Sequence, residues 1–440
     1  MEALVFTDNS TVEFIKQENE EMGLSFEDFV SWIKEPPNYT TFRVNTLHYT
    51  VKDALQLISE NVAKTALQIN ATRCAEVYIN KDFPDVINVG SWDFSINEAP
   101  SDEVVVDAFC GAAILRGSHL FAPGVLALPK GSAVGQQVSV YADLDGMCLQ
   151  GTATKYKGNK MLVGTGILEL DREKLFNNIA EKPKGIAVRM TWTRKGILSF
   201  DYPIGMGQLQ NVPSSAASWE LNPLPGDLVL DMCASPGNKT SHLAALMNNE
   251  GVLVAIDRTE KKCNIIRETC DSFKAKCLAF CYDSSKSVLE DDEPKKKIED
   301  GPPFNQNSFD KILLDAPCSA LGQRPQLLNK ISVKQIKSNP TLQKRLFKAA
   351  VKLLKPKGTL VYCTCSTTLE ENEGVVQWAL QEFQGVLALI EARKRITPVI
   401  LLKNVPEDIC AKVQRFGPQV GSVSEYCDSI GFFISRFVKI

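Results

Sequence analysis

Two cysteines in this sequence stand where a thiol could do chemistry. Cys318 ends the motif Asp315-Ala316-Pro317-Cys318, and Cys365 is the centre of Thr364-Cys365-Ser366; each motif directly follows an apolar run. A thiolate in a polar cleft is a strong nucleophile, so either residue could attack a substrate. A buried structural cysteine is the default interpretation for most of the 13 cysteines, and these two are set apart by position rather than by type.

Carboxylates follow the ends of several apolar runs. Asp257 comes after 252–256, Asp283 after 278–282 and Asp315 after 311–314. If these runs are parallel strands, their carboxyl ends meet at one edge of a sheet, where open α/β sheets bind ligands. Acids at successive strand tips indicate a nucleoside-bearing cofactor, with one carboxylate on the ribose hydroxyls and another near the adenine amine.

A turn of small residues joins the first expected strand, 228–230, to a helix expected over 242–247. The turn is not a P-loop, because Cys233 stands where that pattern needs glycine and Asn238 precedes Lys239. It is not the dinucleotide fingerprint either, since Gly237 is its only glycine. The turn is a weak indication by itself and a much stronger one together with the acids and the two cysteines.

Length and composition limit the class of protein in which these residues can lie. The 440 residues allow two or three domains, and 44% hydrophobic content is that of an ordinary globular protein. The net charge of -3 gives no global attraction to nucleic acid, so any basic surface must be local. Met1–Phe14 has no basic start or long apolar run, so no secretory signal is expected, and no apolar run reaches membrane-spanning length. The cysteines therefore indicate free thiols in a reducing compartment, and we expect a cytoplasmic monomer.

Metal binding is not expected. The three histidines lie far apart in sequence, and the cysteine pairs 277/281 and 363/365 lack a second matching pair. A structural zinc site needs four ligands brought together in such pairs.

The chain divides into three parts. Residues 1–101 are expected to form an α+β module that begins with a helix over 12–34 and packs on the catalytic domain. Residues 102–185 hold short apolar runs separated by glycines, which is typical of a small barrel. Over 101–185 there are 9 basic and 9 acidic residues, so charge leaves an RNA-binding barrel and a protein-docking barrel equally open. Residues 186–440 alternate strands and helices, as in a Rossmann-like sheet.

Local signals within this last part give four further predictions. Pro340 is expected to begin a helix, and Thr368-x-x-Glu371 to form the capping box of the next one. Residues 429–438 are expected to form a strand at the sheet edge. The charged insert 286–308 is interpreted as a solvated loop, with a docking role as the weaker alternative.

Residues 324–357 contain ten Lys and Arg and no Asp or Glu. The solvated face of an amphipathic helix accounts for Lys344, Lys348, Lys352 and Lys355, but it accounts poorly for the absence of acids. We therefore predict phosphate contacts for some of these residues, in particular Arg324 and Lys330.

Taken together, the motifs resemble the Nop/Sun-type RNA cytosine carbon-5 methyltransferases, and most of all the subgroup that carries an inserted PUA domain and acts on transfer RNA. The matching segments are 231–240, 315–319, 322–325, 364–366 and 430–434. Residues 102–185 resemble the PUA domain itself through Cys110-Gly111 and 115–124, which marks Arg116 as an RNA contact. Ser235, Asn238 and Ala320 depart from the family pattern, and Asn suits a positive φ better than most residues. The resemblance runs from about Pro36 to the end of the chain.

The resemblance implies S-adenosylmethionine as methyl donor. It implies that Cys365 adds to carbon 6 of cytosine, that Asp315 holds the base, and that Cys318 helps to remove the carbon-5 proton and release the product. Asp257 would lie at the ribose, Asp283 near adenine and Asp315 near the methyl donor. The remaining cofactor contacts implied are Cys233, Ala234, Ser235, Pro236, Gly237, Asn238 and Lys239.

The implied substrate is a cytosine in the acceptor stem of transfer RNA near the 3′ CCA end, with messenger RNA as a further candidate. A base near an open end of RNA is the easiest to unstack. Two other classes are weighed against this one. An inactive RNA-binding scaffold is disfavoured by the presence of both cysteines and all three acids, and a small-molecule or protein methyltransferase is disfavoured by the basic segment and the PUA-like insert.

Overall fold

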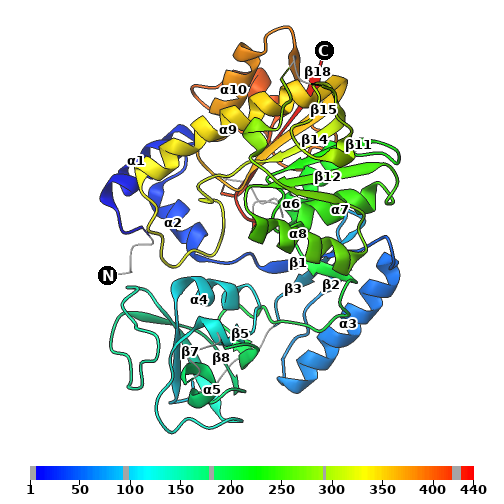
Figure 1. Cartoon of the computed structure of the whole chain (residues 1–440). Coiled ribbons are helices and arrows are strands. Elements are labelled where there is room, and N and C mark those ends of the chain that lie inside the picture. The colour runs from blue at the N-terminus through cyan, green and yellow to red at the C-terminus, as the bar shows by residue number, and fades with distance from the viewer. Residues whose placement is uncertain (1–5, 93–98, 178–182, 291–293, 419–427) are drawn as a thin grey trace.

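The computed structural model describes residues 6–92, 99–177, 183–290, 294–418 and 428–440. In Figure 1 an α/β domain lies above a β-rich unit, and the N-terminal module lies against both. In the described part of the chain, no helix has the length and apolar character needed to cross a membrane.

The helices are α1 (Asn9–Glu21), α2 (Phe26–Lys34), α3 (Val51–Gln68), α4 (Ala108–Leu115), α5 (Arg172–Phe176), α6 (Val212–Leu221), α7 (Asn238–Leu246), α8 (Glu260–Phe273), α9 (Val333–Leu353), α10 (Glu373–Glu382) and α11 (Glu407–Lys412), with 3₁₀ turns η1 (Ala122–Gly124), η2 (Ser284–Lys286) and η3 (Ile298–Asp300). The strands are β1 (Tyr39–Val44), β2 (Val77–Ile79), β3 (Val86–Gly90), β4 (Glu103–Val106), β5 (Leu120–Phe121), β6 (Val125–Ala127), β7 (Gln137–Asp143), β8 (Lys160–Leu168), β9 (Ile186–Thr193), β10 (Gly207–Leu209), β11 (Leu228–Met232), β12 (Val252–Asp257), β13 (Leu278–Cys281), β14 (Phe309–Asp315), β15 (Leu354–Thr364), β16 (Leu387–Ile390), β17 (Gln414–Phe416) and β18 (Phe432–Lys439).

The sheet of the α/β domain has the strand order β13-β12-β11-β14-β15-β18-β16, with β17 also paired to β18. The strands from β13 to β15 are parallel, and β18 is antiparallel to both of its neighbours on this path. The order reverses between β11 and β14, and ligands of open α/β sheets bind at such a switch point. The predicted Rossmann-like sheet is confirmed.

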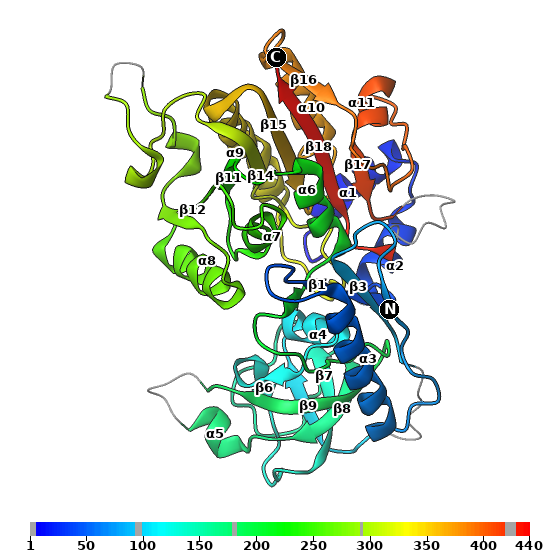
Figure 2. The same cartoon turned by 90° about the vertical axis from the view of Figure 1, so that its right-hand side faces the viewer.

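The predicted edge strand is the one part of this sheet that was placed wrongly. β18 lies between β15 and β16, inside the sheet (Figure 2). Its first residues, Phe432, Phe433 and Ile434, are all buried, because helices cover both faces of the sheet. Adjacent apolar residues on opposite faces are typical of a strand buried on both sides.

Helices form the two outer layers. Apolar residues of α9, α10 and α11 pack on one face of the sheet, and those of α6, α7 and α8 pack on the other. α9 begins at Val333 behind a capping box formed by Ser332 and Gln335, so Pro340 lies inside this helix and does not begin it. α7 likewise begins earlier than predicted, at Asn238.

The N-terminal module depends on residues far along the chain. Its sheet has the order β10-β1-β3-β2, so β10, which follows the β-rich unit, completes a sheet begun before it. The helix predicted over 12–34 is two helices, since Gly23 has φ +69° and Ser25 caps α2. α1 and α2 pack on the α/β domain through a cluster that includes Phe29, Leu321 and Ile336.

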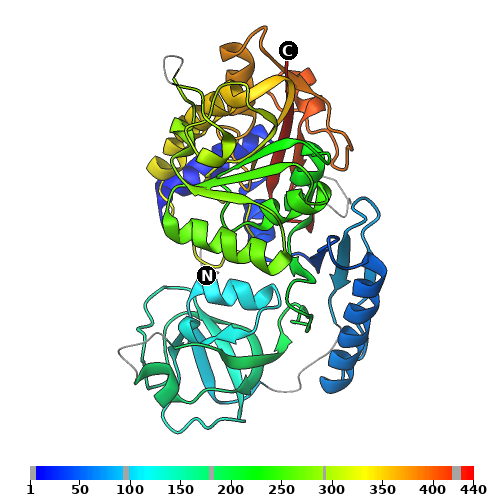
Figure 3. The ribbon, with the colours of Figure 1, turned by 45° about the vertical axis from the view of Figure 1, so that its right-hand side comes forward.

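The β-rich unit forms the lower part of the molecule in Figure 3. Its strand order is β5-β9-β8-β7-β4-β6. β9 pairs with β8 and β5, so the unit extends past the expected boundary at residue 185. Leu327, from the loop after β14, packs into the core of this unit. The unit and the α/β domain therefore share a packed junction.

Candidate active site

The two cysteines lie together at the carboxyl edge of the large sheet. β14 and β15 are parallel neighbours, with Asp315 opposite Cys363, so the loops that follow them start side by side. Cys318 Sγ and Cys365 Sγ are 3.4 Å apart. The structure thus brings together two residues that are 47 positions apart in the chain.

The pKa values of the two thiols are shifted in opposite directions. A hydrogen bond from the Cys318 thiol lowers the pKa of Cys365, although burial opposes this. The same interaction, together with burial, raises the pKa of Cys318 well above its usual value. Of the two, Cys365 therefore loses its proton more readily and Cys318 keeps its proton more firmly, which makes Cys365 the better nucleophile.

An ion pair connects these cysteines to the turn after β11. Lys239 Nζ lies 2.7 Å from Asp315 Oδ2. Burial alone would lower the pKa of Lys239, but the neighbouring Asp315, Cys363 and Asp231 raise it. The ammonium ion is thus fixed at the tip of β14, at the switch point of the sheet.

The turn itself is shaped by two left-handed residues. Cys233 has φ +62° and Gly237 has φ +98°. Asn238 is the first residue of α7 and is not left-handed, so the prediction that its side chain serves a positive φ is wrong. The Ser235 amide donates to Asp257 Oδ2 at 3.1 Å, which ties the turn to the tip of β12.

A cavity of about 320 Å³ lies beside this turn. Cys233, Asp257 and Asp283, predicted from separate segments, all line it. The other lining residues are Arg258, Thr259, Lys262, Tyr282, Ser284, Pro317, Leu342 and Leu346. Carboxylates suit ribose hydroxyls and the apolar wall suits a flat base, so these residues fit the adenosyl part of S-adenosylmethionine.

Arg43 is a residue of this site that sequence reasoning missed. It lies on β1, is fully buried, and donates to Asn238 O at 3.2 Å and to Ser241 Oγ at 2.8 Å. Burial lowers its pKa to about 10. The N-terminal module therefore supports the first turn of α7, and no local sequence signal could reveal this, because the partners are about 200 residues away.

A second cavity, of about 400 Å³, lies between α4 of the β-rich unit and the loop that follows Cys318. Ser319, Ala320 and Gln323 line it on one side, and Arg116 and the 78% exposed Phe109 on the other. Arg116 thus lines the same cavity as the loop that follows Cys318, and the exposed ring of Phe109 is of the kind on which a base could stack.

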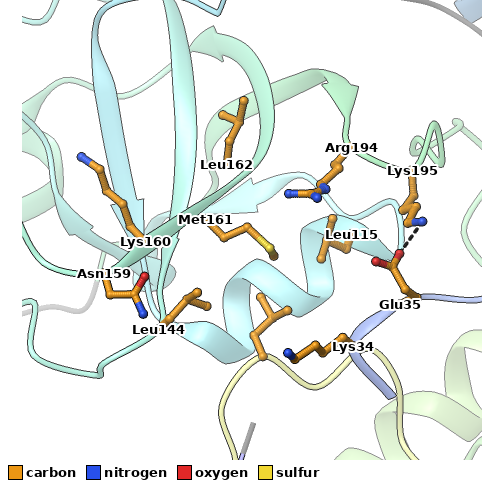
Figure 4. Close-up of a pocket in the computed structure, with 11 residues that line it drawn as sticks. Lys34, Glu35, Leu115, Leu144, Asn159, Lys160, Met161, Leu162, Arg194 and Lys195 are labelled. Carbon is orange, nitrogen blue, oxygen red and sulfur yellow. Dashed lines mark ion pairs between the residues drawn. The ribbon is translucent and has the colours of Figure 1, made fainter. Parts of the chain in front are cut away.

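A third cavity, of about 420 Å³, continues along this junction (Figure 4). Its lining includes the apolar Leu115 and Met161 and the basic Lys160, Arg194 and Lys195. Lys160 is paired with Glu103, and Lys195 with Glu35. The exposed side chain of Lys330 lies against Gly146 of the β-rich unit. This junction therefore collects basic groups although the chain as a whole is slightly acidic.

Arg324 has a different place from the one predicted. It is only 3% exposed, and its guanidinium donates to Glu35 O, Pro36 O, Asp428 Oδ1 and Ser429 O while it lies over the ring of Trp32. These internal acceptors use the donors that a phosphate would need, so Arg324 joins the N-terminal module to the α/β domain. The α9 lysines follow the amphipathic interpretation: Lys348 pairs with Glu382 and Lys344 lies over Trp378.

The predicted capping box is also corrected. α10 begins at Glu373 with Asn372 as its N-cap residue, and no side chain caps it. Thr368 Oγ1 does donate to Glu371 Oε2 at 2.9 Å, but the carboxylate of Glu371 points into the loops that carry the two cysteines. The sequence pattern of a capping box therefore belongs to Glu371, which does not cap α10 but accepts hydrogen bonds from the two cysteine-bearing loops.

Comparison with known proteins agrees with this geometry. Residues 218–398 match the family described as 16S rRNA methyltransferase RsmB/F. A human protein named tRNA (cytosine(72)-C(5))-methyltransferase NSUN6 is 37% identical over 445 residues, which cover 96% of this chain and 92% of that protein. A protein named tRNA (cytosine(72)-C(5))-methyltransferase from Pyrococcus horikoshii is 28% identical, over 93% of this chain and 91% of its own length.

Similarity in structure extends over the whole chain. The crystal structure of NSun6 from Pyrococcus horikoshii with SFG, an analogue of S-adenosylmethionine, matches with a TM-score of 0.71 and 26% identity. The match covers 99% of this chain and 98% of that one. It therefore includes the N-terminal module and the β-rich unit as well as the α/β domain.

Proposed function

The chain belongs to the Nop/Sun family of S-adenosylmethionine-dependent RNA (cytosine-5)-methyltransferases, and from this premise we propose that it methylates a cytosine in the acceptor stem of transfer RNA, near the 3′ CCA end. One observation carries the catalytic assignment: Cys318 and Cys365 lie 3.4 Å apart beside Asp315, where their contact lowers the pKa of Cys365 and raises that of Cys318. Two relatives that act on cytosine 72 of transfer RNA, according to their names, support the choice of substrate.

Cys365 is the nucleophile in this proposal. Its thiolate forms a bond to carbon 6 of the cytosine, and the electron pair released into the ring makes carbon 5 reactive. Asp315 holds the base through its ring nitrogen or amino group, while Lys239 holds Asp315. When bound, S-adenosylmethionine supplies the methyl group as a sulfonium, a chemistry that needs alignment more than a metal.

Cys318 acts after methyl transfer. The hydrogen bond with Cys365 is the first cause of the raised pKa of Cys318, and burial and the charge on Cys365 add to it. Once the Cys365 sulfur is bonded to carbon 6 it carries no charge, so the pKa of Cys318 falls. Cys318 then gives its own proton to water, and the resulting thiolate can accept the carbon-5 proton. Loss of that proton re-forms the 5,6 double bond and expels the Cys365 thiolate.

The β-rich unit binds the RNA end as a PUA-like domain. Arg116 and Lys330 contact phosphates, and the junction cavities receive the nucleotides that follow the stem. We further propose a cytoplasmic monomer; the cysteines in the described part of the chain are all free thiols, which supports a reducing compartment.

Covalent trapping tests the catalytic proposal. The Cys318→Ala variant, mixed with transfer RNA and S-adenosylmethionine, should accumulate a protein–RNA band on a denaturing gel, because attack proceeds and release fails. The band should disappear in Cys318→Ala/Cys365→Ala. Absence of the band, together with no methyl transfer by the wild-type protein on total RNA, would exclude this function.

A further inference from the structure

Glu371 is a fully buried carboxylate that lies between the two cysteine-bearing loops. Ser319, which follows Cys318, donates to it from the backbone amide at 2.8 Å and from the hydroxyl at 2.5 Å. Ser366, which follows Cys365, donates from its hydroxyl at 2.5 Å. One carboxylate thus accepts hydrogen bonds from the neighbours of both cysteines.

The rest of its surroundings completes the shell. Asn339 Nδ2 lies 2.9 Å and Gln343 Nε2 3.3 Å from Oε1, while Thr368 Oγ1 donates to Oε2 at 2.9 Å. Gln343 also donates to Pro317 O at 3.0 Å, so α9 is attached to the first cysteine motif through the same group. We propose that Glu371 is a positioning residue for the reaction, which sets the relative position of the two cysteine loops.

The chemistry of this shell favours a catalytic reason for the acid. Among the described residues Glu371 forms no ion pair, and all its donors are neutral. Burial of a carboxylate without a cation is costly, and a neutral side chain could join two loops at a lower cost. We therefore expect the negative charge of Glu371 to contribute to the reaction.

In this proposal the charge of Glu371 raises the pKa of Cys318 and so keeps the proton on that thiol. After the Cys365 thiol and burial, the charge of Glu371 is among the causes that raise the pKa of Cys318. A carboxylate that holds both loops can thus set the distance between the sulfurs and also decide which sulfur is the thiolate. Removal of the charge with retention of shape, in Glu371→Gln, separates the two effects.

The experiment uses full-length Glu371→Gln and Glu371→Ala, with Glu220→Gln as the matched control. Glu220 is also buried and accepts from Arg393 N at 2.8 Å and Gln414 Nε2 at 2.9 Å, away from both cysteine loops. For each protein, kcat and KM are measured on transfer RNA, S-adenosylmethionine affinity by calorimetry, and the iodoacetamide labelling of Cys318 relative to Cys365 by peptide mass spectrometry.

We expect Glu371→Gln to bind S-adenosylmethionine like the wild type, and its kcat to fall about tenfold or more with KM unchanged. The labelling ratio of Cys318 to Cys365 should rise several-fold, because Cys318 becomes more acidic. In Glu371→Ala the loops lose their junction, and kcat should fall about 10²-fold, as for a shift of about 1 Å at a reacting group. Glu220→Gln should leave kcat and the labelling ratio unchanged.

Two results would overturn the proposal: a Glu371→Gln variant with wild-type kcat and labelling ratio, or losses in kcat that Glu220→Gln reproduces at equal loss of thermal stability. The inference rests on the proposed roles of the two cysteines. Methyl transfer by the wild-type protein tests the function, and trapping with Cys318→Ala tests the cysteine roles, so failure of the function and failure of the inference are distinguishable.

Discussion

Lys239 Nζ and Asp315 Oδ2, 2.7 Å apart, join the turn after β11 to the strand tip that precedes Cys318. The pair lies at the point where the strand order of the sheet reverses. One ion pair therefore connects the cofactor side of the site to the cysteine side. A substitution on either side should change the geometry of the other.

Removal of Lys239 tests this coupling. Lys239→Met leaves Asp315 and the fully buried Asp231 without their cation, so the free energy of unfolding in urea should fall by about 3 kcal/mol. Methyl transfer should be lost as well. Lys262→Met is the control, because Lys262 is 54% exposed where it pairs with Asp257, and it should cost at most about 1 kcal/mol. Equal losses in the two variants would contradict the coupling.

Asp231 gives a prediction about pH. Burial raises its pKa from 3.8 to about 7, which is opposite in direction to the usual case for an aspartate that accepts a hydrogen bond. Between these two values the folded protein binds a proton that the unfolded chain does not, so the stability from this group falls as pH rises through the window. Asp231→Asn removes that loss while Thr240 can still donate to the amide oxygen.

The melting temperature of Asp231→Asn relative to wild type should therefore be higher at pH 8 than at pH 5. Each protein is measured at both values by differential scanning calorimetry in the same salt, so that all other titrating groups cancel in the difference. A difference that is independent of pH would show that Asp231 is charged throughout this range.

Ala320, in the loop after Cys318, has φ +57°. A left-handed conformation costs an alanine roughly 1–2 kcal/mol, and glycine avoids this cost. Ala320→Gly should therefore stabilise the protein by about 1 kcal/mol in urea unfolding. Ala316→Gly, in the same loop but without a positive φ, should destabilise it, because glycine gains freedom in the unfolded chain. The same sign of change in both variants would argue against strain at Ala320.

Gly322 occupies a site with no room for a side chain. A Cβ there would lie 2.0 Å from Gly431 O and 2.8 Å from Cys365 O, both of them backbone atoms. Gly322→Ala must therefore displace the backbone around Gly322, Gly431 and Cys365. We expect the Cys365 loop to move with it, and kcat to fall about 10²-fold. Gly90→Ala, where a Cβ meets only ordinary contacts at 3.6 Å, should keep the wild-type kcat. A normal kcat in Gly322→Ala would show that the Cys365 loop tolerates displacement.

The position of the residues with a local signal follows from the sequence. Asp257, Asp283, Asp315, Cys318 and Cys365 each follow an apolar run, and a parallel sheet brings the ends of such runs to one edge. Their meeting follows from strand pattern and chain order alone. The same logic predicted the α/β sheet.

The residues that were misjudged depend on partners distant in sequence. Arg324 looked like a phosphate ligand within a basic segment, but its acceptors at Glu35 and Pro36 are nearly 290 residues away. Glu371 looked like a helix cap, but four of the six hydrogen bonds that its carboxylate accepts within the described part of the chain come from the Cys318 loop and α9. Neither environment leaves a trace in the neighbouring sequence.

The sequence by itself thus determined which groups could react and at which edge of a sheet they would stand. The tertiary structure decided which charges are buried and what satisfies them. The physical reason is that strand and helix patterns express hydrophobic periodicity along the chain, which is local. The burial of a charged group and the placement of its hydrogen-bond partners depend on surfaces that only folding brings together.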